Sequence, residues 1–156
     1  MPSTYDTQLA AATANLVVAA RIYRSTADKA LSDLGLSQAT AWPIVMTGRM
    51  GDGVRQGALA EALAIEGPSL VRVLDQLVAS GLMTREEDPT DRRAKRLHLT
   101  PAGQAVRQQA EDLLLVLRRR LFKGVDEKEV QVFLNVLDAL KLSLDEKNAE
   151  SAGGGA

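Results

Sequence analysis

The sequence predicts a mainly α protein, of α+β type, in which one two-stranded ribbon interrupts a series of helices. Through most of the chain, apolar residues recur every three to four positions, the spacing of one helix face. Residues 82–85 and 94–99 can instead pair as strands across a charged turn. Hydrophobic residues make up 46% of the chain and aromatic residues only 3%, so the core must consist of Leu, Val and Ala. This composition favours helices.

The first predicted helix spans residues 9–34 and follows a loose stretch, residues 1–7. Arg21 and Arg24 lie three positions apart, so both side chains can point into one concavity. Guanidinium groups pair well with carboxylates. These two arginines are therefore candidates for an anion clamp, and the alternative is that both are simply solvated.

A second helix is predicted from Ser37, whose hydroxyl can cap it, to about Arg49. Trp42 and Met46 are four positions apart and share a face. They pack in the core or form one wall of a ligand pocket. Pro43 lies inside this helix and removes one hydrogen bond, so a bend or a broken turn is expected there.

Residues 56–80 have the pattern of two helices joined by a tight turn. A short helix, residues 56–63, is followed by a four-residue link and a helix over residues 68–80. Pro68 suits a first helical position, and Gly81 suits the left-handed residue that ends a helix. The length of the link and its glycine are typical of a helix-turn-helix.

The second of these helices has a polar face formed by Ser69, Arg72 and Gln76. Arginine can pair with guanine and glutamine with adenine, each through two hydrogen bonds. This face can therefore read base edges. The alternative is the solvated face of an ordinary amphipathic helix.

The ribbon that follows has a charged tip, residues 86–93, in which Pro and Asp predict a turn. An arginine-tipped ribbon beside a helix-turn-helix is a winged helix. The alternative is a solvated hairpin of mixed charge.

Two further helices are predicted after the ribbon, one capped by Thr100 and running to about Lys123, and one capped by Asp126. They carry more apolar surface than a small winged domain can cover. Together with the first helix they fit a symmetric dimer interface, and the alternative is a monomeric helical layer. Three consecutive arginines, residues 118–120, point around the helix and are interpreted as solvated or interface-rim charges.

Composition excludes several classes of function. The net charge of −1 means that any DNA contact must come from local basic clusters. The absence of cysteine excludes disulfides, thiolate zinc sites and a cysteine redox switch. With one histidine, His98, and no metal-ligand or activated-serine spacing, an enzyme has little support. No apolar run reaches the roughly 18 residues of a membrane span and no secretory signal opens the chain, which predicts a cytoplasmic protein.

Four runs of the sequence resemble the winged-helix core of the MarR family of bacterial transcription regulators, and look closest to its SlyA branch. They are PSLVR-LDQL (68–77), SGLMTR (80–85), DRRAKR (91–96) and LT-AG (99–103). The resemblance implies a single domain over residues 1–156. Its parts would be a helical dimerisation region (8–34 and 101–147), a winged helix-turn-helix core with a two-stranded wing (36–100) and a flexible tail (148–156).

The resemblance also implies a homodimer that binds double-stranded operator DNA at a pseudo-palindromic site. In the family, Asp91 would pair with Arg93 to stiffen the wing, and Arg92 would reach the minor groove. The expected DNA-binding residues are Pro68, Ser69, Arg72, Gln76, Arg85, Arg92, Lys95 and Arg96.

Family members commonly lose affinity for DNA when a small aromatic or phenolic carboxylate binds, so the resemblance implies a repressor with such an effector. Arg21, Arg24, Trp42 and Met46 are the expected ligand-binding residues. No metal and no cofactor are expected. The alternatives are a ligand-independent regulator, a counter-silencer, or a winged-helix module that binds another protein.

Overall fold

The computed structural model describes the backbone of residues 1–153 and the side chains of residues 1–144. The chain divides into two compact units, Met1–Arg118 and Arg119–Ala156. The predicted tail, residues 148–156, is helical as far as Gly153, and residues 154–156 lie outside the described residues.

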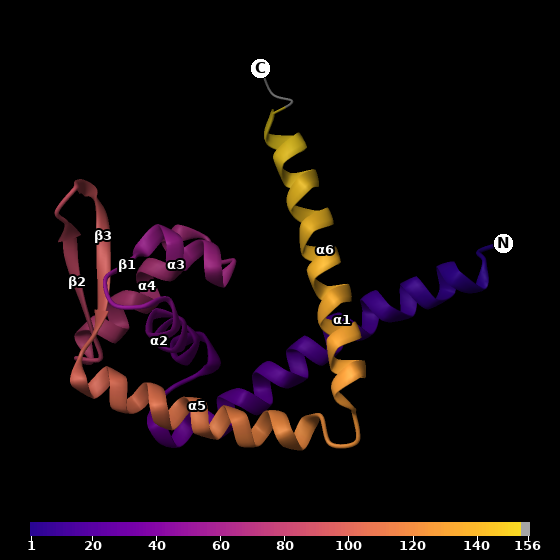
Figure 1. Ribbon diagram of the computed structural model, residues 1–156, viewed down its shortest axis with the longest axis horizontal. Coiled ribbons are helices and arrows are strands. Elements are labelled where there is room, and N and C mark those ends of the chain that lie inside the picture. Colours follow the sequence, from indigo (N-terminus) through magenta and orange to yellow (C-terminus); the bar gives the residue numbers. More distant parts are fainter. Residues whose placement is uncertain (154–156) are drawn as a thin grey trace. The chain divides into compact units, whose positions relative to one another are not determined.

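Helices dominate the fold, and a small antiparallel sheet is formed by one short strand before α3 (Gln56–Leu63) and two longer strands after α4 (Gly67–Ala79) (Figure 1). This confirms the predicted fold class. The elements in chain order are α1 (Thr4–Leu31), a short 3-10 helix (Ser32–Leu34), α2 (Gln38–Met50), β1 (Val54–Arg55), α3 (Gln56–Leu63), α4 (Gly67–Ala79), β2 (Met83–Asp88), β3 (Asp91–Leu99), α5 (Pro101–Leu121) and α6 (Glu127–Gly153).

Helix α1 starts earlier than the sequence analysis predicted. Ser3 and Asp6 form a capping box, in which each side chain accepts a hydrogen bond from the backbone amide of the other. These two bonds satisfy amides that a helix start leaves without partners. The expectation of a loose stretch over residues 1–7 is therefore wrong for residues 4–7, which are helical, while residues 1–3 precede the helix.

The predicted caps of the later helices are confirmed. Ser37 caps α2, the hydroxyl of Thr100 accepts a hydrogen bond from the amide of Gly103 over 3.0 Å, and Asp126 caps α6. Helix α2 runs without interruption through Pro43, which is buried. The expected broken turn at this proline is not observed, although its backbone still lacks a donor.

The sheet has three strands in the order β1-β3-β2, all antiparallel (Figure 1). The predicted two-stranded wing is thus extended by β1, which is only two residues long. Strands β2 and β3 are also longer than expected, because only Pro89 and Thr90 separate them. The long charged loop predicted over residues 86–93 is therefore a tight hairpin turn.

One buried core joins the helices and the sheet within the first unit. Its largest fully buried apolar side chains come from α1, α2, α3, α4, β2 and β3: Leu31, Ile44, Leu59, Leu70, Leu74, Met83 and Leu97. Gly103 lies at the start of α5, where an added Cβ would stand 1.9 Å from the carbonyl oxygen of Leu82. Only glycine allows this close approach, which fixes α5 to the base of the wing.

Large apolar side chains also remain exposed in each unit. On α1 they are Tyr5, Leu9, Leu16, Val17, Val18 and Ile22, and on α6 they include Val132, Phe133, Leu134, Val136 and Leu140. Within the described residues, no helix combines the length and apolar character that a membrane crossing requires.

Candidate nucleic-acid interface and pocket

Helix α4 presents a polar face because its apolar residues point into the core. Leu70, Leu74 and Leu77 are buried, at the three- and four-residue spacing of one helix face. Pro68 occupies the first turn, and Gly81 just beyond the helix has a left-handed φ of 73°. The two residues therefore have the positions predicted for them.

The opposite face of α4 is open to solvent. Ser69, Arg72 and Gln76 are all exposed there, together with Pro68 at the start of the helix. The turn between α3 and α4 passes through Ala64, which has the left-handed φ of 51°. The geometry thus brings together the four side chains predicted for base or phosphate contact on this helix.

The arginines predicted for the wing tip lie on a strand instead. Arg92 and Arg93 are exposed residues at the start of β3, directly after the turn. Asp91 contacts Arg93, but its carboxylate accepts a hydrogen bond from the Arg93 backbone amide over 3.0 Å. The expected ion pair with the Arg93 guanidinium is not formed, because the short turn directs the carboxylate towards the main chain.

Three cations among the expected DNA-binding residues are each paired with a carboxylate. The pairs are Arg85 with Asp75 (2.7 Å), Lys95 with Glu87 (3.2 Å) and Arg96 with Asp88 (3.0 Å). Arg72, Arg92 and Arg93 form no ion pair with any side chain that the structure describes. Their charge is therefore available to an external anion.

The wing contains a buried carboxylate, Asp88, that the sequence pattern did not predict. The side chain of Asp88 is fully buried and accepts hydrogen bonds from Thr90, Arg96 and Arg55. The Thr90 hydroxyl and amide, and then the two arginines, hold the pKa of Asp88 well below its usual range, against the opposing effect of desolvation. Asp88 follows two solvated glutamates in the sequence, so no local pattern predicted its burial.

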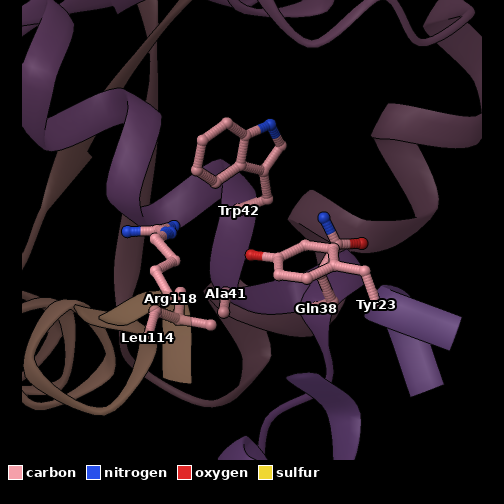
Figure 2. Close-up of a pocket in the computed structure, with 6 residues that line it drawn as sticks. All are labelled: Tyr23, Gln38, Ala41, Trp42, Leu114 and Arg118. Carbon is pink, nitrogen blue, oxygen red and sulfur yellow. The ribbon is translucent and has the colours of Figure 1, made fainter. Parts of the chain in front are cut away.

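A small, mainly apolar pocket lies within the first unit, between α1, α2 and α5. Tyr23 contributes from α1, and the other lining residues are Gln38, Ala41, Trp42, Leu114 and Arg118. Figure 2 shows the rings of Tyr23 and Trp42 and the guanidinium of Arg118 around one space. The pocket therefore combines two aromatic walls with a positive charge.

The residues predicted to bind a ligand are only partly brought together. Trp42 lines the pocket, and Met46 packs against the core nearby. Arg21 and Arg24 are exposed and are not among the lining residues. The cation at the pocket is Arg118, because the packing of α5 turns this one of the three consecutive arginines inward.

No cluster of His, Asp or Glu side chains in the described part of the chain could hold a metal ion. The groups that the two sites do present are suited to recognition. Exposed guanidinium and amide groups on α4 and β3 suit phosphates and base edges, and the pocket suits an aromatic anion.

Comparison with known proteins identifies relatives of this fold. A sequence model described as MarR family matches residues 34–94. The transcriptional regulator PA3341 is 34% identical, with a TM-score of 0.77 over 86% of this chain and 98% of that one. A MarR-family transcriptional regulator from Silicibacter pomeroyi is also 34% identical, with a TM-score of 0.64 over 76% of this chain and 79% of that one.

A structure of a mutant MarR from E. coli was determined in complex with operator DNA. It has the same fold, with 21% identity and a TM-score of 0.75 over 89% of this chain and 99% of that one. The similarity therefore extends over the winged core and the flanking helices.

Proposed function

Because the chain belongs to the MarR family of transcriptional regulators, we propose that it is a homodimeric repressor, which an aromatic carboxylate releases from a pseudo-palindromic operator. Its place in the family makes it a DNA-binding regulator of transcription. The observation that carries the proposal is the exposed α4 face with Arg72 and Gln76. On the wing, Arg92 is exposed as well and forms no ion pair with a described side chain.

On DNA, α4 would lie in the major groove, with Arg72 and Gln76 at base edges and Ser69 at a base or phosphate. The free amides at the start of the helix, beside Pro68, would bind a phosphate. Arg92 would enter the adjacent minor groove, where the negative potential of A·T-rich sequence attracts arginine.

The paired cations of the wing would have a different role. Arg85 and Lys95 lie nearer the base of the wing than Arg92 and would contact the DNA backbone by exchanging a carboxylate for a phosphate. Arg96 would contact it through its terminal guanidinium nitrogens, while its Nε stays bonded to Asp88. Asp91 would shape the turn through the Arg93 amide.

The DRRAKR run (91–96) supports placement of the chain in the SlyA branch of the family.

DNA binding itself is tested by selecting bound genomic fragments and measuring their affinity at two salt concentrations. A protein that neutralises several phosphates loses affinity steeply as salt rises. If every selected fragment bound weakly and with no dependence on salt, the winged helix would have to serve another partner, such as a protein.

The dimer is supported by the exposed apolar side chains of α1 and α6. Large exposed apolar surfaces on a small domain usually mark an interface, and two copies related by a twofold axis would cover both helices. Two α4 helices would then meet successive major grooves about 10 base pairs apart.

Light scattering with matched charge variants tests the dimer. Val132→Asp buries a charge if α6 is an interface, since Val132 is 62% exposed in the single chain. We expect this variant to have the monomer mass. Gln131→Glu on the same helix is the control for added charge, because the exposed Gln131 adjoins Val132 in the chain and points about 100° away from it around the helix, and this variant should remain a dimer. A wild-type chain with the monomer mass would refute the proposal.

The effector class is supported by the pocket. Tyr23 and Trp42 offer faces for one aromatic ring, and Arg118 offers a charge-assisted pair for a carboxylate. Calorimetry with a panel of benzoate and cinnamate derivatives tests this. For an acid that binds, Arg118→Ala should weaken binding about tenfold or more, whereas Arg21→Ala should not. If Arg21→Ala weakened binding more than Arg118→Ala, Arg21 would be the residue that pairs with the carboxylate. If no acid in the panel bound, a ligand-independent regulator would be favoured.

A further inference from the structure

The carboxylate of Asp88 holds two arginines and a turn at once. Its Oδ2 accepts a hydrogen bond from Arg55 Nε over 2.8 Å and from Arg96 Nε over 3.0 Å. Its Oδ1 accepts from the backbone amide of Thr90 over 2.8 Å and from the Thr90 hydroxyl over 2.6 Å. The side chain is fully buried, so Asp88 cannot contact DNA itself.

These bonds join three separate parts of the wing. Arg55 lies on β1, whose last residue is followed directly by α3 of the helix-turn-helix. Arg96 lies on β3, and the two arginines are partners in the pairing of β1 with β3. Thr90 is in the hairpin turn, two residues before Arg92. The carboxylate thus links the turn that precedes Arg92 to the strand that leads into the helix-turn-helix.

The regular ladder between β2 and β3 does not hold this turn by itself. The pairing shifts between Glu87 and Asp88, where the strands have an irregularity of the β-bulge kind. Bulges bend a hairpin and leave its direction to other contacts. Two carboxylates form ion pairs at this bulge: Glu87, which is exposed and pairs with Lys95 over 3.2 Å, and Asp88, which is fully buried. Arg55 adds a further bond to the turn, since its Nη2 donates to Thr90 Oγ1 over 3.2 Å.

We infer that Asp88 is a positioning residue for DNA binding, which sets the direction of the wing and thereby brings Arg92 to the minor groove. Asp91 has a smaller part, because it is exposed and accepts one backbone hydrogen bond. The inference rests on the proposed role of Arg92. It assigns to the buried carboxylate the stiffening effect that the family resemblance implied for Asp91.

Asp88→Asn is the sharpest test, because the amide has the size of the carboxylate and can still accept from Thr90. Its nitrogen would face two arginine N–H groups, so the link to β1 and β3 is lost. We expect operator affinity to fall about tenfold, which is the usual size of the interaction energy between residues in contact. Asp91→Asn is the matched control, and its operator affinity should stay within about threefold of the wild-type value.

A double-mutant cycle with Arg92→Ala separates positioning from a purely structural effect. If Asp88 acts through Arg92, the double variant should bind operator no more weakly than Arg92→Ala does. Operator affinity unchanged in folded Asp88→Asn, or losses that multiply fully in the double variant, would overturn the inference. If Arg92→Ala weakened binding equally to operators with A·T and with G·C flanks, the proposed minor-groove role of Arg92 would be wrong. The double-mutant cycle would still show whether Asp88 acts through Arg92.

A second variant keeps the test valid if Asp88→Asn does not fold, which circular dichroism will show. Arg55→Met removes one arm of the link and leaves Asp88 bound to Arg96 and Thr90. The Arg55 side chain is half exposed, so the change disturbs little of the core. We expect a smaller loss of operator affinity that is again absent in the Arg92→Ala background. A loss of the same factor in both backgrounds would overturn the inference.

Discussion

Arg85 on β2 donates a hydrogen bond to Asp75 on α4 over 2.7 Å, so the wing and the second helix of the helix-turn-helix are joined by an ion pair. The side chains are 29% and 53% exposed. Exposed pairs contribute only about 0–1 kcal/mol. A DNA phosphate can therefore replace Asp75 as the partner of Arg85 without a large loss of stability.

Asp75→Asn should accordingly tighten binding to DNA. The substitution frees Arg85 and removes a negative charge from the face that meets the phosphates. We expect higher affinity and a salt dependence steeper by about one counterion, measured by fluorescence anisotropy at several salt concentrations. Weaker binding would show that Asp75 holds the guanidinium in its productive orientation.

Arg72→Ala tests base recognition by α4. Arg72 is exposed and makes no ion pair among the described side chains, so its removal should leave the fold intact. Operator binding should weaken by about 1–3 kcal/mol, with relaxed specificity at one base position. Competition among operators substituted at single positions measures both effects. A uniform loss across all sequences would make Arg72 a phosphate contact instead.

The helices could be predicted from sequence because local signals determine them. The apolar spacing of Leu70, Leu74 and Leu77 fixes α4, and the hydroxyls of Ser37 and Thr100 fix two helix starts. Strand β1 could not be predicted, since two residues carry no periodicity. It exists because β3 offers an edge to pair with, which is a tertiary effect.

The sites were predictable only where exposure follows from the helix pattern. Arg72 and Gln76 lie opposite the buried face of α4, so their positions followed from spacing. The position of Arg118 at the pocket could not be predicted, because three consecutive arginines point in different directions around a helix. Only the packing of α5 determines which of them faces inward. Asp88 lies at the end of an acidic run, and its burial depends on Arg55, 33 positions away in the chain.

Acid should selectively remove the stabilisation that comes from Asp88. Hydrogen bonds from Thr90, and then from Arg96 and Arg55, lower its folded pKa below the usual 3.8. The unfolded chain therefore binds the proton first as pH falls. The stabilisation is complete above the unfolded pKa and is lost as pH decreases towards the folded value.

The measurement is the difference in thermal midpoint between wild type and Asp88→Asn across pH. We expect a constant difference between about pH 5 and pH 8 that narrows below about pH 4. The other carboxylates titrate in both proteins, so their contributions to the thermal midpoint cancel in the difference. A gap that stays constant into strong acid would mean that the ionised form is not what stabilises the wing.

Gly103→Ala should strongly destabilise the first unit. Its Cβ would stand 1.9 Å from the backbone oxygen of Leu82, and a backbone atom cannot move away as a flexible side chain would. We expect a loss of about 2–4 kcal/mol, at the upper end of single substitutions, in urea unfolding followed by circular dichroism. Gly57→Ala is the control, since it lies in α3 with no atom within 4 Å of its added Cβ. That change should stabilise by about 0.5–1 kcal/mol through helix propensity. If the two variants were equally stable, α5 would have to dock on the wing with more freedom than this contact implies.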